Sequence, residues 1–146
     1  MNEIRFLVRP RDDLGVHEVV PRVDGELLTE VVEAFERAAG MDPPGGYGGL
    51  IPAFFRFGPL DEHFHGRRAG ADSPATPVLG CDCGEWGCWP FMAHIDVTDT
   101  TVTWAAFTQP HRPTRDYTGL GPLRFDRRQY DAALAGLCQE LASWEQ

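Results

Sequence analysis

Three of the four cysteines fall within eight residues, in the pattern Cys-x-Cys-x4-Cys. Thiolates bind soft metal ions and carry out thiol–disulfide exchange, so this cysteine turn (residues 81–88) is the segment best suited to chemistry. If residues 84–87 form a hairpin loop, Cys83 and Cys88 stand opposite each other, and Cys81 lies on the same face two residues earlier. The spacing therefore predicts that the three sulfurs converge.

Three interpretations of the cysteine turn stay open. Cys81, Cys83 and Cys88 are candidate ligands of a structural zinc ion, which needs a fourth ligand such as His111 or a histidine from residues 63–65. Alternatively, Cys83 and Cys88 form a redox dithiol, although the segment has no basic residue to lower a thiol pKa and its carboxylates would raise it. In the third interpretation, the cysteines are reduced and packed as small apolar residues.

A second candidate site lies in the Pro-rich segment 109–117, which follows a predicted core strand. Binding residues often occupy such loops. The segment provides His111, Arg112 and Arg115, and Arg127 stands at the start of a predicted helix. Because guanidinium groups and helix N-termini both bind anions, these four residues are predicted to form an anion-binding site. The alternative is a set of solvated surface side chains.

Composition excludes several classes of function. All 13 basic residues are arginine, so the chain has neither a Schiff-base lysine nor a Walker-type phosphate loop. Its two serines do not lie in a Gly-x-Ser-x-Gly motif, which argues against a serine hydrolase. A net charge of −9 disfavours nucleic acid and anionic membranes as partners. With no apolar signal or membrane-spanning segment, a cytoplasmic location is expected, and the oligomeric state is open.

Hydrophobic periodicity predicts an α+β fold with a single domain over residues 1–146. Alternating apolar residues predict a mainly antiparallel sheet, with a strand at residues 3–9 and a β-meander at about 77–108. Apolar residues at helical spacing predict two helices, at about 26–39 and 127–143. A core of this kind places the cysteine turn between two strands of the meander.

Other segments give weaker local signals. Residues 18–23 contain a proline, which predicts a sheet edge or irregular structure. The glycines of residues 45–49 predict a flexible loop, and the aromatic residues 54–57 a short core strand. Cys138 is expected to lie in the core, beside the leucines of the second helix.

Residues 79–90, together with 102–104, Phe107, 109–111 and 125–127, resemble a family of uncharacterised bacterial proteins. The resemblance covers most of the chain. It implies no cofactor and no catalytic residues, although some members carry the label oxidoreductase. The Cys-x-Cys-Gly turn is more loosely similar to small cytosolic immunity-type proteins, which neutralise toxins by binding them.

Two functions are therefore expected to compete. Small size, acidity and the lack of a complete catalytic constellation favour a cytosolic protein-binding domain without catalysis, similar to an immunity protein. The alternative is a metal- or thiol-dependent enzyme of oxidoreductase type, centred on Cys81, Cys83 and Cys88, with His111 and Arg112 binding the substrate.

Overall fold

The computed structural model describes residues 1–54, 59–67 and 75–144. Within them, no helix is long and apolar enough to cross a membrane. The elements follow one another in the order β1 (Ile4–Arg11), β2 (Val16–Val23), β3 (Glu26–Leu27), α1 (Leu28–Ala38), β4 (Tyr47–Gly48), α2 (Leu60–His63), β5 (Ala75–Cys81), the 3-10 helix η1 (Trp86–Cys88), β6 (Phe91–Val97), β7 (Thr101–Thr108), β8 (Leu123–Asp126) and α3 (Arg127–Trp144).

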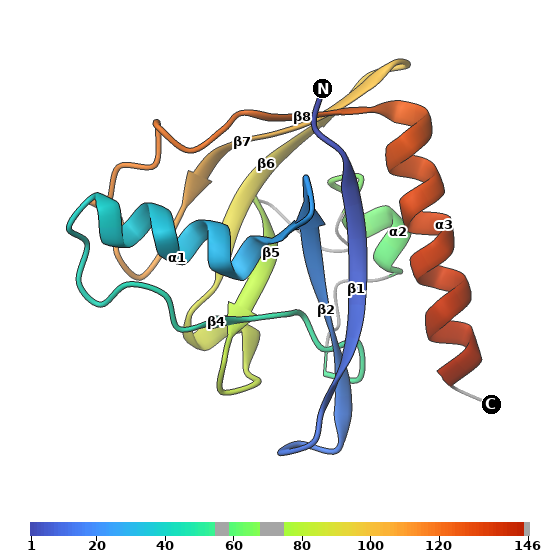
Figure 1. The fold of residues 1–146 in the computed structure, drawn as a ribbon, viewed down its shortest axis with the longest axis horizontal. Helices are drawn as coiled ribbons and strands as arrows, with labels where there is room; N and C mark the ends of the chain where they lie inside the picture. The colour runs from blue at the N-terminus through green and yellow to red at the C-terminus, as the bar shows by residue number, and fades with distance from the viewer. Residues whose placement is uncertain (55–58, 68–74, 145–146) are drawn as a thin grey trace.

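The strands form two antiparallel sheets, which confirms the α+β class (Figure 1). One sheet has the order β1-β2-β3, and the other the order β4-β5-β6-β7-β8, so the predicted meander is β5-β6-β7. Two isolated bridges join the sheets, between Asn2 and Phe125 and between Val19 and Leu50. The result is a curled sheet in which the start of β1 neighbours β8, and β2 neighbours the residues that follow β4.

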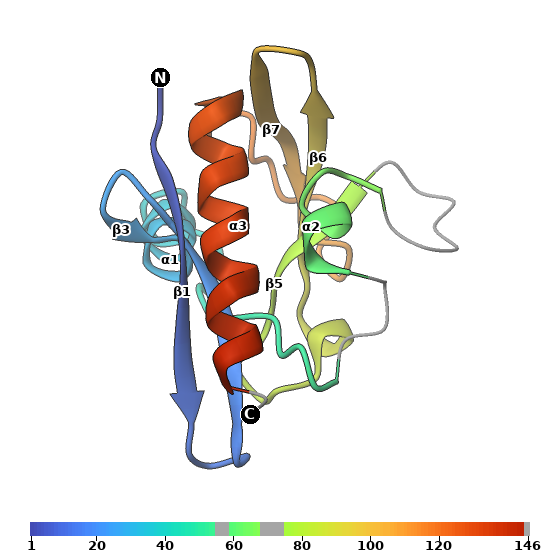
Figure 2. The same cartoon turned by 90° about the vertical axis from the view of Figure 1, so that its right-hand side faces the viewer.

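Helix α3 lies between the β1-β2 hairpin and the β5-β7 meander (Figure 2). Its buried residues, Tyr130, Leu134 and Leu137, belong to the predicted apolar stripe. Cys138 is exposed, so its predicted place in the core was wrong. One residue after Leu137, the helix has turned by about 100°, which carries Cys138 off the buried face.

Aromatic rings fill the space under α3. Trp104 and Phe64 stack with ring centroids 6.1 Å apart, and Phe125 and Tyr130 pack against Trp104 edge-on. The Trp104 indole N–H donates to the Tyr130 hydroxyl at 3.1 Å, and that hydroxyl donates to the Phe64 carbonyl. The polar ends of these buried rings are thus satisfied, as burial of Trp and Tyr requires.

The first helix begins later than predicted. Glu26 and Leu27 pair with β2 as strand β3, so α1 starts at Leu28. The reversal occurs at Asp24 and Gly25, whose φ angles of 52° and 84° are typical of the two-residue turns that suit hairpins.

Strand β2 is longer and better paired than its proline suggested. It pairs with β1 along its length and with β3 at its end, so the predicted edge or irregular structure was wrong. Val19, two residues before Pro21, directs its N–H away from β1 to the Leu50 carbonyl. Pro21 has the same orientation, so its missing N–H removes no bond between β1 and β2.

The glycines of residues 45–49 are not a flexible loop, because Tyr47 and Gly48 pair with β5 as β4. A Cβ atom at Gly49 would lie 2.5 Å from the Val19 carbonyl oxygen, so only glycine allows this close approach.

The predicted strand at 54–57 falls mainly on residues 55–57, outside the described residues; Phe54 is in a turn and half-exposed.

Strand β7 departs from strict alternation. Ala106 has a φ of 51°, and the register between β6 and β7 shifts between Met92 and His94. Val102 and Trp104 are buried in alternation, but after the bulge Phe107 is buried and Ala106 is exposed, so the buried positions shift by one residue.

Replacing Gly49 with alanine is expected to destabilise the protein by about 1–3 kcal/mol, because the methyl group overlaps the Val19 carbonyl. Urea unfolding measures the change. Gly136→Ala is the matched control: nothing lies within 4 Å of its Cβ position in α3, so a gain of about 0.5–1 kcal/mol is expected. Equal effects of the two substitutions would contradict the close approach.

Candidate functional site

The cysteine turn connects β5 to β6 at the end of the molecule that also carries the β1-β2 turn (Figures 1 and 2). The ladder between β5 and β6 ends at the pair Leu79 and Phe91, so the connection is longer than the four-residue loop predicted. Cys81 instead pairs with Tyr47 of β4. The segment folds back over β5, where a Cβ atom on Gly80 would lie 2.9 Å from Trp86 Cα.

Cys83 and Cys88 are therefore not a cross-strand pair, and that prediction was wrong. The three cysteines are nevertheless neighbours in the turn, since both Cys81 and Cys88 contribute to the shifted pKa of Cys83. The main-chain N–H of Cys83 donates to Cys81 Sγ at 3.4 Å. All three are free thiols, and Cys83 and Cys88 are exposed while Cys81 is partly buried.

The pKa of Cys83 lies below the ordinary thiol value. The main-chain N–H of Glu85 contributes most by donating to the sulfur, and the hydrogen bonds with Cys81 and Cys88 also lower the pKa. Asp82 opposes this shift through its charge. The expectation that nearby carboxylates would dominate was wrong for Cys83, because main-chain and thiol donors outweigh them.

The two neighbouring thiols behave in the opposite way. Burial contributes most to raising the pKa of Cys81 to about 11; the Cys83 main-chain N–H opposes this shift, and the Cys83 thiol adds to it. The hydrogen bond with Cys83 and partial burial also raise the pKa of Cys88. Near neutral pH, the turn thus holds one activated thiol between two protonated ones.

Main-chain contacts fix the position of the turn. The Asp82 N–H donates to the Gly46 carbonyl at 3.0 Å, and Arg11 Nη2 donates to the Asp82 carbonyl at 2.6 Å. Within the turn, Gly84 N–H donates to the Cys81 carbonyl. The β1-β2 hairpin and the segment before β4 therefore both hold the cysteine turn.

The predicted binding segment lies against the same turn. His111 Nε2 is 2.8 Å from the Gly87 carbonyl, and the Arg112 and Arg115 guanidinium carbons lie 4.9 and 5.6 Å from the centre of the Trp89 ring. Two sets of residues predicted separately from the sequence thus belong to one region. His111 directs a ring nitrogen to a carbonyl of the turn, a structural contact.

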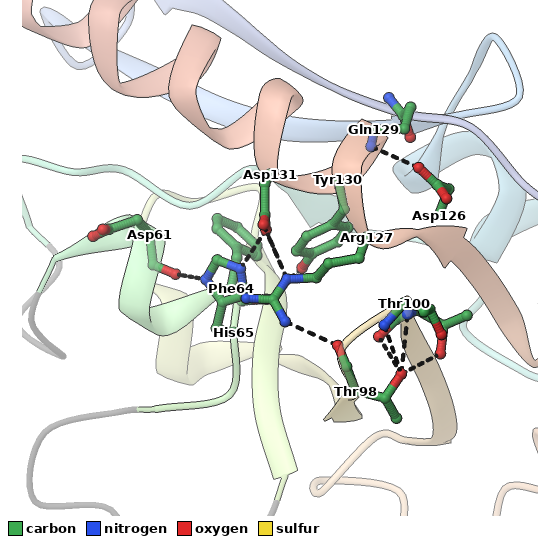
Figure 3. A network of polar contacts seen from close by, with 11 residues as sticks. Asp61, Phe64, His65, Thr98, Thr100, Asp126, Arg127, Gln129, Tyr130 and Asp131 are labelled. Carbon is green, nitrogen blue, oxygen red and sulfur yellow. Dashed lines mark hydrogen bonds and ion pairs between the residues drawn. The ribbon is translucent and has the colours of Figure 1, made fainter.

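Arg127 lies apart from this region, in a network beside α2 (Figure 3). It donates to the Asp131 carboxylate at 3.0 Å and to the Thr98 carbonyl at 2.9 Å. His65 bridges the same carboxylate and the Asp61 carbonyl. The predicted anion site of four residues is therefore not assembled, because Arg127 links α3 to the β6-β7 turn instead.

The zinc prediction is not tested by these contacts. In the part of the chain that the structure describes, no three or more His, Cys, Asp or Glu side chains form a group suited to a metal ion. The candidate fourth ligands also have other neighbours: His63 Nε2 lies 2.7 Å from the Pro77 carbonyl, and His65 lies in the network of Figure 3.

Sequence reasoning missed the most connected side chain of the region, Glu36 of α1. Its carboxylate is fully buried and accepts hydrogen bonds from the Tyr47 and Tyr117 hydroxyls at 2.7 and 2.6 Å. It also accepts from the Gly45 N–H at 2.7 Å and from Arg115 at 3.2 Å. The helical spacing could have predicted this burial, because Glu36 follows Leu28 and Val32 at intervals of four residues and therefore lies on the same buried face of α1.

The partners of Glu36 extend the network toward the cysteine turn. Gln109 donates to the Tyr47 hydroxyl at 3.1 Å, and the Trp89 indole donates to the Gly45 carbonyl at 2.9 Å. Burial raises the pKa of Tyr47 and of Tyr117, so both hydroxyls keep their protons and act as donors.

Comparisons of the chain with models of protein families, with curated proteins and with solved structures found no match. The functional assignment therefore rests on the thiols of the cysteine turn, the arginines around Trp89 and the buried carboxylate of Glu36.

Replacing Glu36 with glutamine is expected to destabilise the protein by about 3 kcal/mol, because Arg115, only 7% exposed, loses its ion-pair partner. Urea unfolding provides the measurement. Glu33→Gln on the exposed side of α1 removes a surface pair with Arg37 and is expected to change stability by less than about 0.5 kcal/mol. Similar losses in both variants would show that Glu36 does not organise the region.

The thiols are expected to differ in their pH dependence. Alkylation by iodoacetamide requires the thiolate, so modification of Cys83 should rise at lower pH than modification of Cys81, whose midpoint is expected near pH 11. Quenched samples analysed by peptide mass spectrometry give each profile. Cys88→Ala removes a neighbour that lowers the pKa of Cys83 and should shift the Cys83 profile to higher pH. Identical profiles for Cys83 and Cys138 would contradict the assignment.

Proposed function

We propose that the chain carries out thiol–disulfide exchange at the cysteine turn, with Cys83 as the attacking thiol. The observation that supports this most strongly is an exposed thiol that neighbours two further thiols in one turn and whose pKa is lowered. An exposed low-pKa thiol beside a second thiol is the arrangement that dithiol exchange requires.

The chemistry needs no group beyond the thiols and a disulfide substrate. The Cys83 thiolate attacks one sulfur of the substrate, its S–S bond breaks, and the departing thiolate takes a proton from water. The Cys88 thiol then gives its proton to solvent and attacks Cys83 Sγ, which forms the Cys83–Cys88 bond and releases the second substrate thiol. Two protein thiols are oxidised and one disulfide is reduced; a dithiol reductant reverses both steps.

Cys88 is assigned as the second thiol because it is exposed, as Cys83 is, and lies at the other end of the turn. The pKa values of Cys81 and Cys88 are both raised, so exposure distinguishes them: Cys81 is partly buried at the end of β5 and is less accessible. Both assignments require that the thiols start reduced, which agrees with the proposed cytoplasmic location.

The test uses 2-hydroxyethyl disulfide, which is uncharged. The wild-type protein is expected to react and to form a Cys83–Cys88 bridge, detected by peptide mass spectrometry under non-reducing conditions. Cys83→Ser should abolish the reaction, and Cys88→Ser should stop at a mixed disulfide on Cys83. Cys138→Ser, which changes an exposed thiol on α3, is the control and should react as the wild type does.

Zinc bound by Cys81, Cys83 and Cys88 is the competing hypothesis for the same residues. Elemental analysis of protein purified without chelator separates the two. One equivalent of zinc that protects these thiols from the disulfide would contradict the exchange proposal, as would a reaction rate of Cys83 no higher than that of Cys138.

A protein-binding domain without catalysis is the second candidate function. It is supported by a hollow of about 320 Å³ between the β1-β2 turn and the end of α3. Trp144, 54% exposed, stacks on His17 at its edge with ring centroids 4.3 Å apart. Stable binding of a basic partner protein by the Cys83→Ser variant would favour this candidate.

A further inference from the structure

The charged side chains in and beside the cysteine turn are mainly acidic. Asp82 and Glu85 are exposed within it, and their charges act on the sulfurs: Asp82 raises the pKa of Cys81 and of Cys83, and Glu85 raises the pKa of Cys88. An incoming disulfide therefore meets two carboxylates next to the attacking sulfur.

The neighbouring β1-β2 turn adds acidic charge on one side. Arg11 contacts Asp82 through its carbonyl, but its guanidinium is neutralised by Glu18 at 3.2 Å and by Asp13 at 2.9 Å. Asp12 is exposed beside this group. Arg9 also pairs with Glu18, at 3.0 Å, so on this side the formal charges of Asp12, Asp13 and Glu18 exceed those of Arg9 and Arg11 by one.

The arginines on the other side are turned to the protein. Arg115 is 7% exposed and bound to Glu36 and to the Pro43 carbonyl. Arg112 lies over the face of Trp89 and donates to the His111 carbonyl. On this side, Arg112 is an exposed cation near the turn, against the exposed carboxylates of Asp82 and Glu85.

We infer that the cysteine turn selects positively charged disulfides over negatively charged ones. The inference rests on the proposed thiol–disulfide exchange and names its substrate class. Charges of one sign beside a reactive group raise the local concentration of substrates of the opposite sign and speed their association. Anionic disulfides such as oxidised glutathione are correspondingly repelled by Asp82 and Glu85.

The shape of the site suits a disulfide within a basic polypeptide as well as a small cationic one. The turn is exposed rather than enclosed, so a large substrate can reach Cys83. Leu14, 36% exposed, lies against Gly84 and offers an apolar contact next to the thiols.

The test compares rates of mixed-disulfide formation on Cys83 with cystamine, 2-hydroxyethyl disulfide and oxidised glutathione, using the Cys88→Ser variant so that the adduct accumulates. Each rate is divided by the rate of the same reagent with free N-acetylcysteinamide. At low ionic strength, the corrected rate is expected to be at least about tenfold higher with cystamine than with glutathione disulfide, and the difference should shrink in high salt.

Added substitutions locate the origin of this selectivity. Asp82→Asn with Glu85→Gln should remove most of the preference. Because the charge of Asp82 also raises the pKa of Cys83, the preference in each variant is expressed as the ratio of the charged-reagent rate to the neutral-reagent rate. Glu30→Gln, an exposed carboxylate on α1, is the control and should retain the preference. The assignment to Asp82 and Glu85 would be overturned if the double variant kept the preference for cystamine, whether or not the Glu30→Gln control lost it.

The outcomes separate the two proposals. If Cys83 reacts with the neutral disulfide but the corrected rates are equal for all three reagents, the charge selectivity is overturned and thiol exchange is left intact. If Cys83 does not react with the neutral reagent, thiol exchange itself is overturned.

A disulfide peptide flanked by arginines that reacts faster than cystamine identifies a polypeptide as the preferred source of the charge. A rate no higher than that of cystamine identifies a small cation.

Discussion

The buried carboxylate of Glu36 is the interaction on which the architecture around the cysteine turn depends. A carboxylate without contact to water is strongly unfavourable unless donors surround it, and here the donors come from two separate parts of the chain. Tyr47 and Gly45 bring the segment before β5, and Tyr117 and Arg115 bring the connection between β7 and β8. Satisfying one charge on α1 therefore determines where two long connections lie, although neither has much regular structure of its own.

These two connections are what position the thiols. The segment before β4 accepts hydrogen bonds from Asp82 and from Trp89, on either side of the reactive cysteines, and the later connection contacts the turn through His111. Activation of Cys83 then follows from local geometry, since its pKa is lowered by a main-chain N–H and by two thiols rather than by a neighbouring cation. A site activated in this way can keep an acidic surface, which is the physical basis for preferring cationic disulfides.

The sequence was informative where one periodicity extends over many residues. Alternation predicted the β5-β6-β7 meander, and helical spacing predicted α3 to within one residue of its observed end. The sequence was less informative where tertiary contacts determine the structure. Residues 45–49 are ordered by the close packing of Gly49 on β2. The conformation of the cysteine turn depends on the packing of Trp86 over Gly80 of β5. The spacing placed the three cysteines in one turn, but the hairpin geometry assumed for that turn was wrong. Glu36 was overlooked because its donors are distant in sequence.

A redox titration with disulfide mapping tests the central claim most directly, namely that Cys83 and Cys88 are a reactive pair within an otherwise reduced chain. The protein would be equilibrated in dithiothreitol buffers of graded potential, quenched with acid, alkylated and analysed by peptide mass spectrometry, with metal content measured on the same sample. The account predicts one two-electron transition, a bridge between Cys83 and Cys88, reduced Cys81 and Cys138, and no bound zinc. Four thiols that stay reduced at every potential, or zinc held by Cys81, Cys83 and Cys88, would contradict it.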